Sequence, residues 1–106
     1  MIPRLWRFPL RTHQDIFRKS KRRRGDFLEV FLSNPLEGNP QASIVVGKNV
    51  SLLATKRNHI KRVLGEILRT NILRTTKQTI IVRALVKSSQ ASYEQFKKEL
   101  TFLVGS

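Results

Sequence analysis

The residues of this chain best suited to binding chemistry are the basic and amide side chains within positions 54–69. When this stretch is placed on a helix at about 100° per residue, Asn58, Arg62 and Arg69 fall on one side, and Lys61 lies beside them. Lysine and arginine side chains held in a rigid row bind anionic oxygens through charge-assisted hydrogen bonds. The spacing therefore favours an anionic partner on this side of the helix.

Two more residues bear on that interpretation. Gly65 falls in the same row, although glycine inside a helix costs about 0.5–1 kcal/mol relative to alanine, which suggests that a partner approaches the backbone closely there. Glu66 is the only acidic residue of the stretch, whereas a face that is merely solvated usually mixes both signs. A solvated face stays as the alternative.

The acidic residues and histidines form no recognisable catalytic set. A metal-dependent nuclease needs converging carboxylates to hold its ions. The seven acids show no paired spacing: Asp15, Asp26, Glu29, Glu37, Glu66, Glu94 and Glu99. His13 and His59 could act as general acid and base only if the fold brought them together, and nothing in the sequence predicts that. Without cysteine the chain also lacks thiolate ligands and disulfides. We therefore expect no active site and no metal site in the protein itself.

Hydrophobic patterning predicts the elements that position the basic row. The side of the helix opposite the row carries an apolar stripe that would pack on a core, made of Leu53, Ile60, Val63, Leu64 and Ile67. Runs rich in strand-forming residues predict strands at 26–32, 42–46 and 79–86, with the first two antiparallel to each other. The third run is apolar almost throughout, which predicts a strand covered on both faces.

Capping patterns predict two further helices. Thr12 followed by Asp15 predicts a short helix that ends near residue 19, and Ser92 with Gln95 forms a capping box ahead of a helix over 93–104. Between the first helix and the first strand lies a basic run that ends at a turn glycine and is expected to be a loop, with Lys21, Arg22, Arg23 and Arg24 in it. Together these elements predict an α+β fold, in which helices cover a small sheet.

Length and composition set the broad class of protein. With 106 residues and no long linker, the chain is expected to form a single domain over 1–106, of which 1–11 form an irregular arm. Lysine and arginine outnumber acids by 21 to 7, giving a net charge of +14, and nucleic acid is the first partner to consider for such a charge. The chain shows no secretory signal and no apolar run of membrane-spanning length. A soluble, cytoplasmic protein with no membrane partner is expected.

A family resemblance joins these observations. The series from Arg57 to Arg62, read as RNHIKR, resembles the Arg-Asn-Arg-x-Lys-Arg signature of the protein subunit of bacterial ribonuclease P, the ribonucleoprotein that trims the 5′ leader from precursor tRNA. Segments 45–49, 80–83 and 89–103 resemble the family in order and approximate spacing, so that the likeness covers about residues 10–104. This chain departs from the family pattern at His13, Val30, His59 and Gly47 to Asn49.

The resemblance implies a fold and a set of roles. The fold would be of the ribosomal S5 domain 2-like type, with a small mixed sheet, three helices and a left-handed βαβ crossover. The residues implied to contact the catalytic RNA are Lys56, Arg57, Asn58, His59, Lys61, Arg62 and Arg69. A cleft for the single-stranded leader would contain His13, Phe17, Val30 and Lys48, and the basic loop 21–24 would add positive charge. The partners would be ribonuclease P RNA and precursor tRNA, and Mg²⁺ would be held by the RNA and not by the protein alone.

Two other classes of protein share the positive charge. A structural RNA-binding protein of the ribosomal type has a similar charge and fold class, and it stays as the alternative. A DNA-binding module fits less well, because the chain has no recognition helix preceded by a tight helical turn. No DNA partner is therefore expected.

Overall fold

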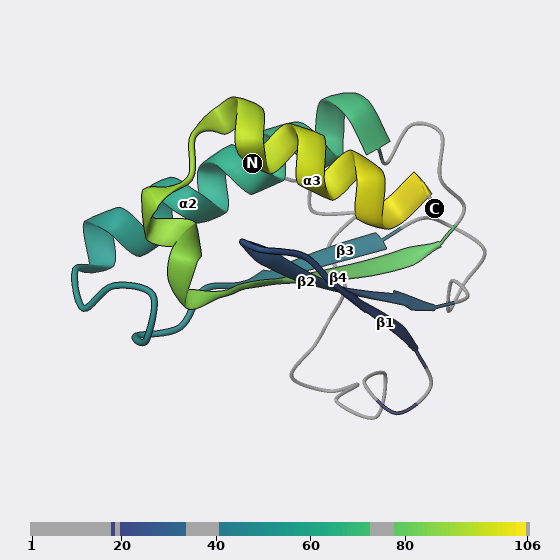
Figure 1. Ribbon diagram of the computed structural model, residues 1–106, viewed down its shortest axis with the longest axis horizontal. Helices are drawn as coiled ribbons and strands as arrows, with labels where there is room; N and C mark the ends of the chain where they lie inside the picture. The colour runs from purple at the N-terminus through teal and green to yellow at the C-terminus, as the bar shows by residue number, and fades with distance from the viewer. Residues whose placement is uncertain (1–17, 19, 34–40, 73–77, 106) are drawn as a thin grey trace.

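The computed structural model of the chain describes residues 18, 20–33, 41–72 and 78–105. The strands are β1 (Lys21–Arg24), β2 (Leu28–Ser33), β3 (Gln41–Val45) and β4 (Thr79–Ala84). The α-helices are α2 (Ala54–Ile67), which continues into a π-helical turn (Leu68–Ile72), and α3 (Tyr93–Gly105), which follows a short 3-10 helix (Val86–Gln90). The described part of the chain is thus an α+β fold, in which both helices lie on the same side of one sheet (Figure 1).

The sheet is mixed, with the strand order β1-β2-β4-β3. Strand β2 is antiparallel to both β1 and β4, while β3 runs parallel to β4 and is joined to it through α2. Strands β2 and β3 run in opposite directions, as predicted, but they are not neighbours, because β4 lies between them. The predicted apolar strand is therefore confirmed as a central strand of the sheet.

One predicted element is wrong, and another lies outside the described residues. The basic residues 21–24 form a strand and not a loop, since they pair in antiparallel register with residues 29–32 of β2. Three α-helices were expected, and the described residues contain two. The expected first helix, to about residue 19, lies outside the described residues apart from Arg18.

The two faces of the sheet differ because side chains alternate along each strand. One face packs against the helices, where Val30, Val82 and Ile44 lie side by side across three strands. The core cluster on this side consists of Leu28, Val30, Leu32, Ala42, Val46, Val50, Ile60, Leu64, Ile67, Leu68, Ile80, Val82, Ala84, Phe96, Leu100 and Leu103. The alternate positions of the strands point to the opposite face, which we call the open face because no described helix covers it (Figure 1). Phe31 and Ile81 are nevertheless buried on this face.

The apolar stripe of α2 is largely as predicted. Ile60, Leu64 and Ile67 are buried, and Val63 is partly buried against the core. Leu53 does not belong to the stripe, because it precedes the first turn in an extended conformation and its side chain is 65% exposed. None of the helices in the described part of the chain is long and apolar enough to cross a membrane.

Helix α3 begins at the predicted capping box. The Gln95 N–H donates to Ser92 Oγ at 3.3 Å, and the Ser92 N–H donates to Gln95 Oε1 at 2.8 Å, so two backbone donors at the helix start are satisfied. The predicted stripe of Phe96, Leu100 and Leu103 is buried in the core. This stripe holds α3 against the sheet beside α2.

A carboxylate on α3 holds the turn between β1 and β2. Glu99 accepts hydrogen bonds from the backbone N–H groups of Asp26, Phe27 and Leu28, at 2.7, 2.9 and 2.7 Å. A Cβ atom on Gly25 would lie 2.5 Å from Glu99 Cδ, so only glycine leaves room for the carboxylate at this point. The turn is therefore shaped around a side chain that is distant in sequence.

We expect Glu99→Gln to destabilise the protein. Glutamine would place an amide N–H opposite a backbone donor and would lose the charge-assisted hydrogen bonds, which costs about 1.5–3 kcal/mol and lowers Tm by roughly 10 °C. Thermal unfolding followed by circular dichroism measures the change. Glu94→Gln is the matched control, because Glu94 is exposed on the same helix and loses the same charge. Equal shifts for the two variants would mean that only net charge matters.

We expect Gly25→Ala to act through the same carboxylate. The new Cβ would force Glu99 out of the turn, so the variant should lose about as much unfolding free energy as Glu99→Ala. In the double variant the two losses should not add, because the second substitution removes a contact that is already broken. A double-mutant cycle with urea unfolding tests this. Additive losses would contradict the coupling between the two residues.

Candidate nucleic-acid interface

The exposed side of α2 carries most of the predicted RNA-contacting residues. Lys56, Asn58, His59, Lys61 and Arg62 are all exposed. None of the five makes a side-chain hydrogen bond or ion pair with another of the residues that the structure describes. Their ends are therefore available to an external acceptor, and the helix backbone fixes the spacing between them.

Arg57 is held by the connection that precedes α2. The Arg57 side chain is half-buried, and its Nη1 donates to the carbonyl oxygen of Ser51 at 2.9 Å. Ser51 Oγ in turn accepts from the backbone N–H of Leu53 at 3.2 Å. Arg57 thus braces the segment before the helix with part of its guanidinium.

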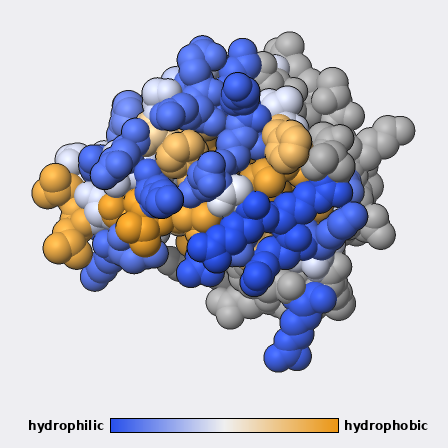
Figure 2. Space-filling view, in the orientation of Figure 1, coloured by the Kyte–Doolittle hydropathy of each residue, from blue (hydrophilic) through white to orange (hydrophobic). Residues whose placement is uncertain are grey.

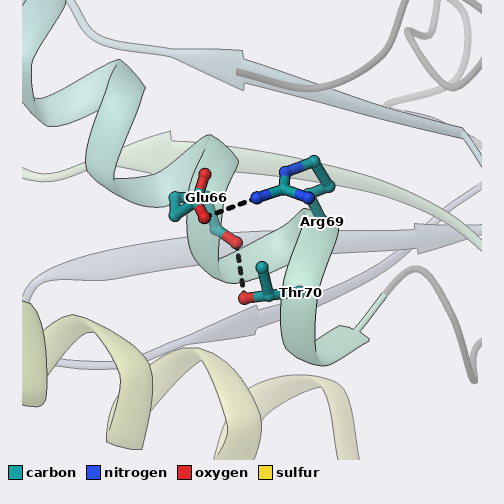
Figure 3. A network of polar contacts seen from close by, with 3 residues as sticks. All are labelled: Glu66, Arg69 and Thr70. Carbon is teal, nitrogen blue, oxygen red and sulfur yellow. Dashed lines mark hydrogen bonds and ion pairs between the residues drawn. The ribbon is translucent and has the colours of Figure 1, made fainter.

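Arg69 lies in the π-helical turn and is engaged with Glu66, as Figure 3 shows. Its Nη2 lies 2.5 Å from Glu66 Oε1, and Thr70 Oγ1 donates to the carbonyl oxygen of Glu66 at 2.7 Å. The Arg69 side chain is 36% exposed. Its charge is partly neutralised by Glu66, so it contributes less to an anion-binding surface than Lys61 or Arg62.

Gly65 does not face a partner. The residue is buried, which contradicts the expectation that it lies in the exposed row. Gly65 is buried together with Ile60, Leu64 and Ile67 of the apolar stripe. An external molecule cannot reach the backbone at Gly65 in this arrangement.

The basic strand β1 sends its side chains to both faces of the sheet. Arg23 lies opposite Val30 and donates from Nη1 to the carbonyl oxygen of Leu103 at 3.1 Å, on the helix side. Arg22 and Arg24 lie on the open face. The strand forms one edge of the sheet, and Figure 2 shows hydrophilic surface over it. Arg23 therefore has a structural contact, whereas its two neighbours face outward.

The open face has an open hollow of about 540 Å³ in which charged and apolar side chains meet. It is lined by Arg22, Phe31, Val45, Gly47, Asn49, Arg83 and Ala84. An adjoining hollow of about 630 Å³ shares Arg22, Asn49 and Arg83 with the first and adds Arg24 and Lys87. Phe31 is buried, so the hollows present mainly cationic side chains, which suit an extended anionic chain.

Glu29 is the only charged side chain that is buried among the described residues. Its carboxylate lies 3.3 Å from Arg22 Nε and 3.8 Å from Arg83 Nη1 on the two flanking strands. Sequence reasoning did not assign Arg83 or Glu29 to a site. The signal was nevertheless present, because each is a charged residue within an otherwise apolar strand.

The structure describes two of the four residues that were predicted for the leader cleft. Val30 is wrongly assigned to it, because its side chain is fully buried in the core on the helix side. Its neighbour Phe31 lies on the open face and lines the hollow there. Lys48 is exposed in the turn after β3, close in sequence to Gly47 and Asn49 of the same hollow. His13 and Phe17 lie outside the described residues.

Two further features complete the description of the surface. Hydrophobic surface gathers at the end of the molecule where the connection into α2 and the 3-10 helix lie (Figure 2). Leu52, Leu53 and Val86 are the exposed apolar residues of these segments. Over the described ranges, no three histidine or acidic residues lie close enough together to hold a metal ion.

Comparison with known proteins agrees with the family resemblance. A family model described as Ribonuclease P matches residues 10–106. The ribonuclease P protein component of Acidothermus cellulolyticus is 33% identical over 105 residues, which span 93% of this chain and 87% of that protein.

Solved structures of bacterial proteins have the same fold. The RNase P protein from Thermotoga maritima matches with a TM-score of 0.80 and 26% identity, over 94% of this chain and 96% of that one. The Staphylococcus aureus RNase P protein matches with a TM-score of 0.83 and 22% identity, over 94% and 93% of the two chains, and this likeness concerns the fold alone. From the family match, the related sequence and the shared fold, we conclude that this chain belongs to the ribonuclease P protein family.

Proposed function

We propose that the chain is the protein subunit of ribonuclease P, and that it binds the catalytic RNA and the 5′ leader of precursor tRNA to support endonucleolytic maturation of the tRNA 5′ end. The observation that carries the proposal is a set of exposed side chains on α2 that lack partners among the described residues. We call this set the α2 row, and it consists of Lys56, Asn58, His59, Lys61 and Arg62. Family membership supports the assignment of this row to RNA.

The two surfaces suit two forms of RNA. A folded RNA presents phosphates at fixed positions, which a rigid helix bearing lysine and arginine can match. A single-stranded leader is flexible and suits a cationic groove, which the open face offers through Arg22 and Arg83. Lys48, with His13 and Phe17, stays in this proposal as part of the leader cleft.

The protein would act by electrostatics and positioning. Each phosphate that it neutralises releases counterions, so RNA binding should weaken as salt increases. By lowering repulsion between RNA backbones, it should reduce the Mg²⁺ concentration that the catalytic RNA needs. The Mg²⁺ ions that assist the cleavage would be bound by the RNA, and the strand that is cut would be held in place by the protein.

Cleavage of precursor tRNA at low Mg²⁺ is the direct test of this function. We expect the protein to restore 5′ leader cleavage by its cognate ribonuclease P RNA at a Mg²⁺ concentration where the RNA alone is slow, because protein charge replaces part of the ionic screening. A ribosomal-type RNA-binding protein would leave the rate unchanged and would co-purify with ribosomal RNA. That result would overturn the proposal.

The row on α2 is tested by removing two of its charges. We expect Lys61→Ala with Arg62→Ala to weaken binding to ribonuclease P RNA by about tenfold or more, and to reduce the slope of log affinity against log salt by about 1.5, because two phosphate contacts are lost. Filter binding over a range of salt concentrations measures both quantities. Folding should be unaffected, since both side chains are exposed.

The matched control is Lys97→Ala with Lys98→Ala, which removes the same charge from α3. We expect this control to lower the affinity much less, and only through the net charge of the protein. If both pairs have the same effect, the α2 row is a solvated face and not a binding surface.

A further inference from the structure

The open face contains a charge arrangement that stability alone does not explain. The Glu29 side chain is 5% exposed, and burying a carboxylate costs free energy unless cations compensate it. Its cations, Arg22 and Arg83, are 65% and 57% exposed. A buried acid is thus paired with two arginines whose ends stay in solvent.

The geometry leaves most of each guanidinium group unused. Glu29 meets Arg22 at Nε, which leaves the two terminal nitrogens of Arg22 for another acceptor. Arg83 approaches through Nη1 at 3.8 Å, which is an ion-pair distance but too long for a hydrogen bond. A guanidinium can bind a phosphate through two parallel hydrogen bonds when it is held in a suitable orientation.

The strand register fixes the spacing between the two arginines. Arg83 lies directly opposite Glu29 on β4, and Arg22 lies diagonally across from it on β1, opposite Phe31. Strand β2 therefore separates the two guanidinium groups, and Glu29 pulls both of them toward the middle of the sheet. Both arginines line the two adjoining hollows of the open face.

We infer that Glu29 is a positioning residue, which holds Arg22 and Arg83 over the open face so that they bind the phosphodiester backbone of single-stranded RNA. This inference rests on the proposed function and adds to it three residues that sequence reasoning had not combined. The site belongs to the sheet and is separate from the α2 row.

A positioning role and a purely electrostatic role of Glu29 predict opposite changes in RNA affinity for one substitution. Glu29→Gln preserves the shape of the side chain and raises the net charge from +14 by one unit. If Glu29 were only a counter-charge, its removal would strengthen RNA binding and steepen the salt dependence. If Glu29 positions the arginines, binding weakens although the protein has become more positive.

The experiment measures binding of a fluorescent oligouridylate by anisotropy over a range of salt concentrations. For Glu29→Gln we expect affinity to fall by about fivefold and the salt slope to decrease by about 0.7, because one phosphate contact is lost. Glu66→Gln is the control, since it makes the same charge change on α2, where Glu66 holds Arg69. It should bind the oligonucleotide as tightly as the wild type or slightly more tightly.

A second pair of variants keeps the test valid if Glu29→Gln does not fold. Arg22→Lys and Arg83→Lys keep the charge but lose the planar guanidinium, and each should weaken oligouridylate binding by about threefold or more. Circular dichroism establishes folding in every case. If folded Glu29→Gln binds as tightly as or more tightly than the wild type, or if the lysine variants bind as the wild type does, the inference is overturned.

Cleavage of precursor tRNA separates this inference from the proposed function. With the cognate RNA, Glu29→Gln should lower kcat/KM for a substrate with a long leader by about fivefold and should leave unchanged the value for a leader of a single nucleotide, a difference that general destabilisation would not produce. If the wild type stimulates cleavage and the variant matches it on both substrates, only the role of Glu29 fails. If the wild type does not stimulate cleavage, the proposed function itself fails.

Discussion

The arrangement of the basic side chains depends on the hydrogen bonds that Glu99 accepts from the turn between β1 and β2. Three backbone N–H groups point at one carboxylate, and the turn is closed by a hydrogen bond from the Gly25 N–H to the Leu28 carbonyl oxygen at 2.8 Å. A slip of one residue in the pairing of β1 with β2 would turn β1 over, because β2 is held in register by β4. Arg22 would then point to the helices, and Arg23 would point to the open face. A single contact from α3 thus protects the register that places arginines on the open face.

Three of the seven acids in this strongly basic chain have structural contacts in the described part of the protein. Glu99 holds a turn, Glu66 holds Arg69, and Glu29 lies between two arginines of the open face. With a net charge of +14, the folded protein repels itself, and acids scattered over the surface would relieve this repulsion only weakly because water screens them. Glu99 instead fixes a backbone turn, and Glu66 and Glu29 fix the positions of arginine side chains. The remaining positive charge is left at the surface for an anionic partner.

Sequence reasoning succeeded where the cause of a structure is local. The capping box of Ser92 and Gln95 and the apolar stripes of α2 and α3 depend on residues a few positions apart, and the structure contains them. It failed where the cause is non-local. Val30 is buried because the helices cover its side of β2, and residues 21–24 form a strand because they pair with β2. Gly65 is buried although it falls in the predicted basic row. The left-handed crossover came from the family resemblance alone and stays a prediction.

The two proposed surfaces differ in how they would select RNA. The α2 row has one acid, Glu66, at its end, so it would bind through summed charge at spacings fixed by the helix, which suits an RNA whose phosphates are already fixed by its own fold. The open face has a buried acid at its centre, which reduces the total attraction but restrains the arginines. A flexible single strand loses conformational freedom on binding, so donors that are already oriented reduce the cost of its capture. The negative charge of Glu29 therefore weakens the non-specific attraction between the open face and RNA. It also holds the arginines in fixed positions for a strand that has no fixed structure of its own.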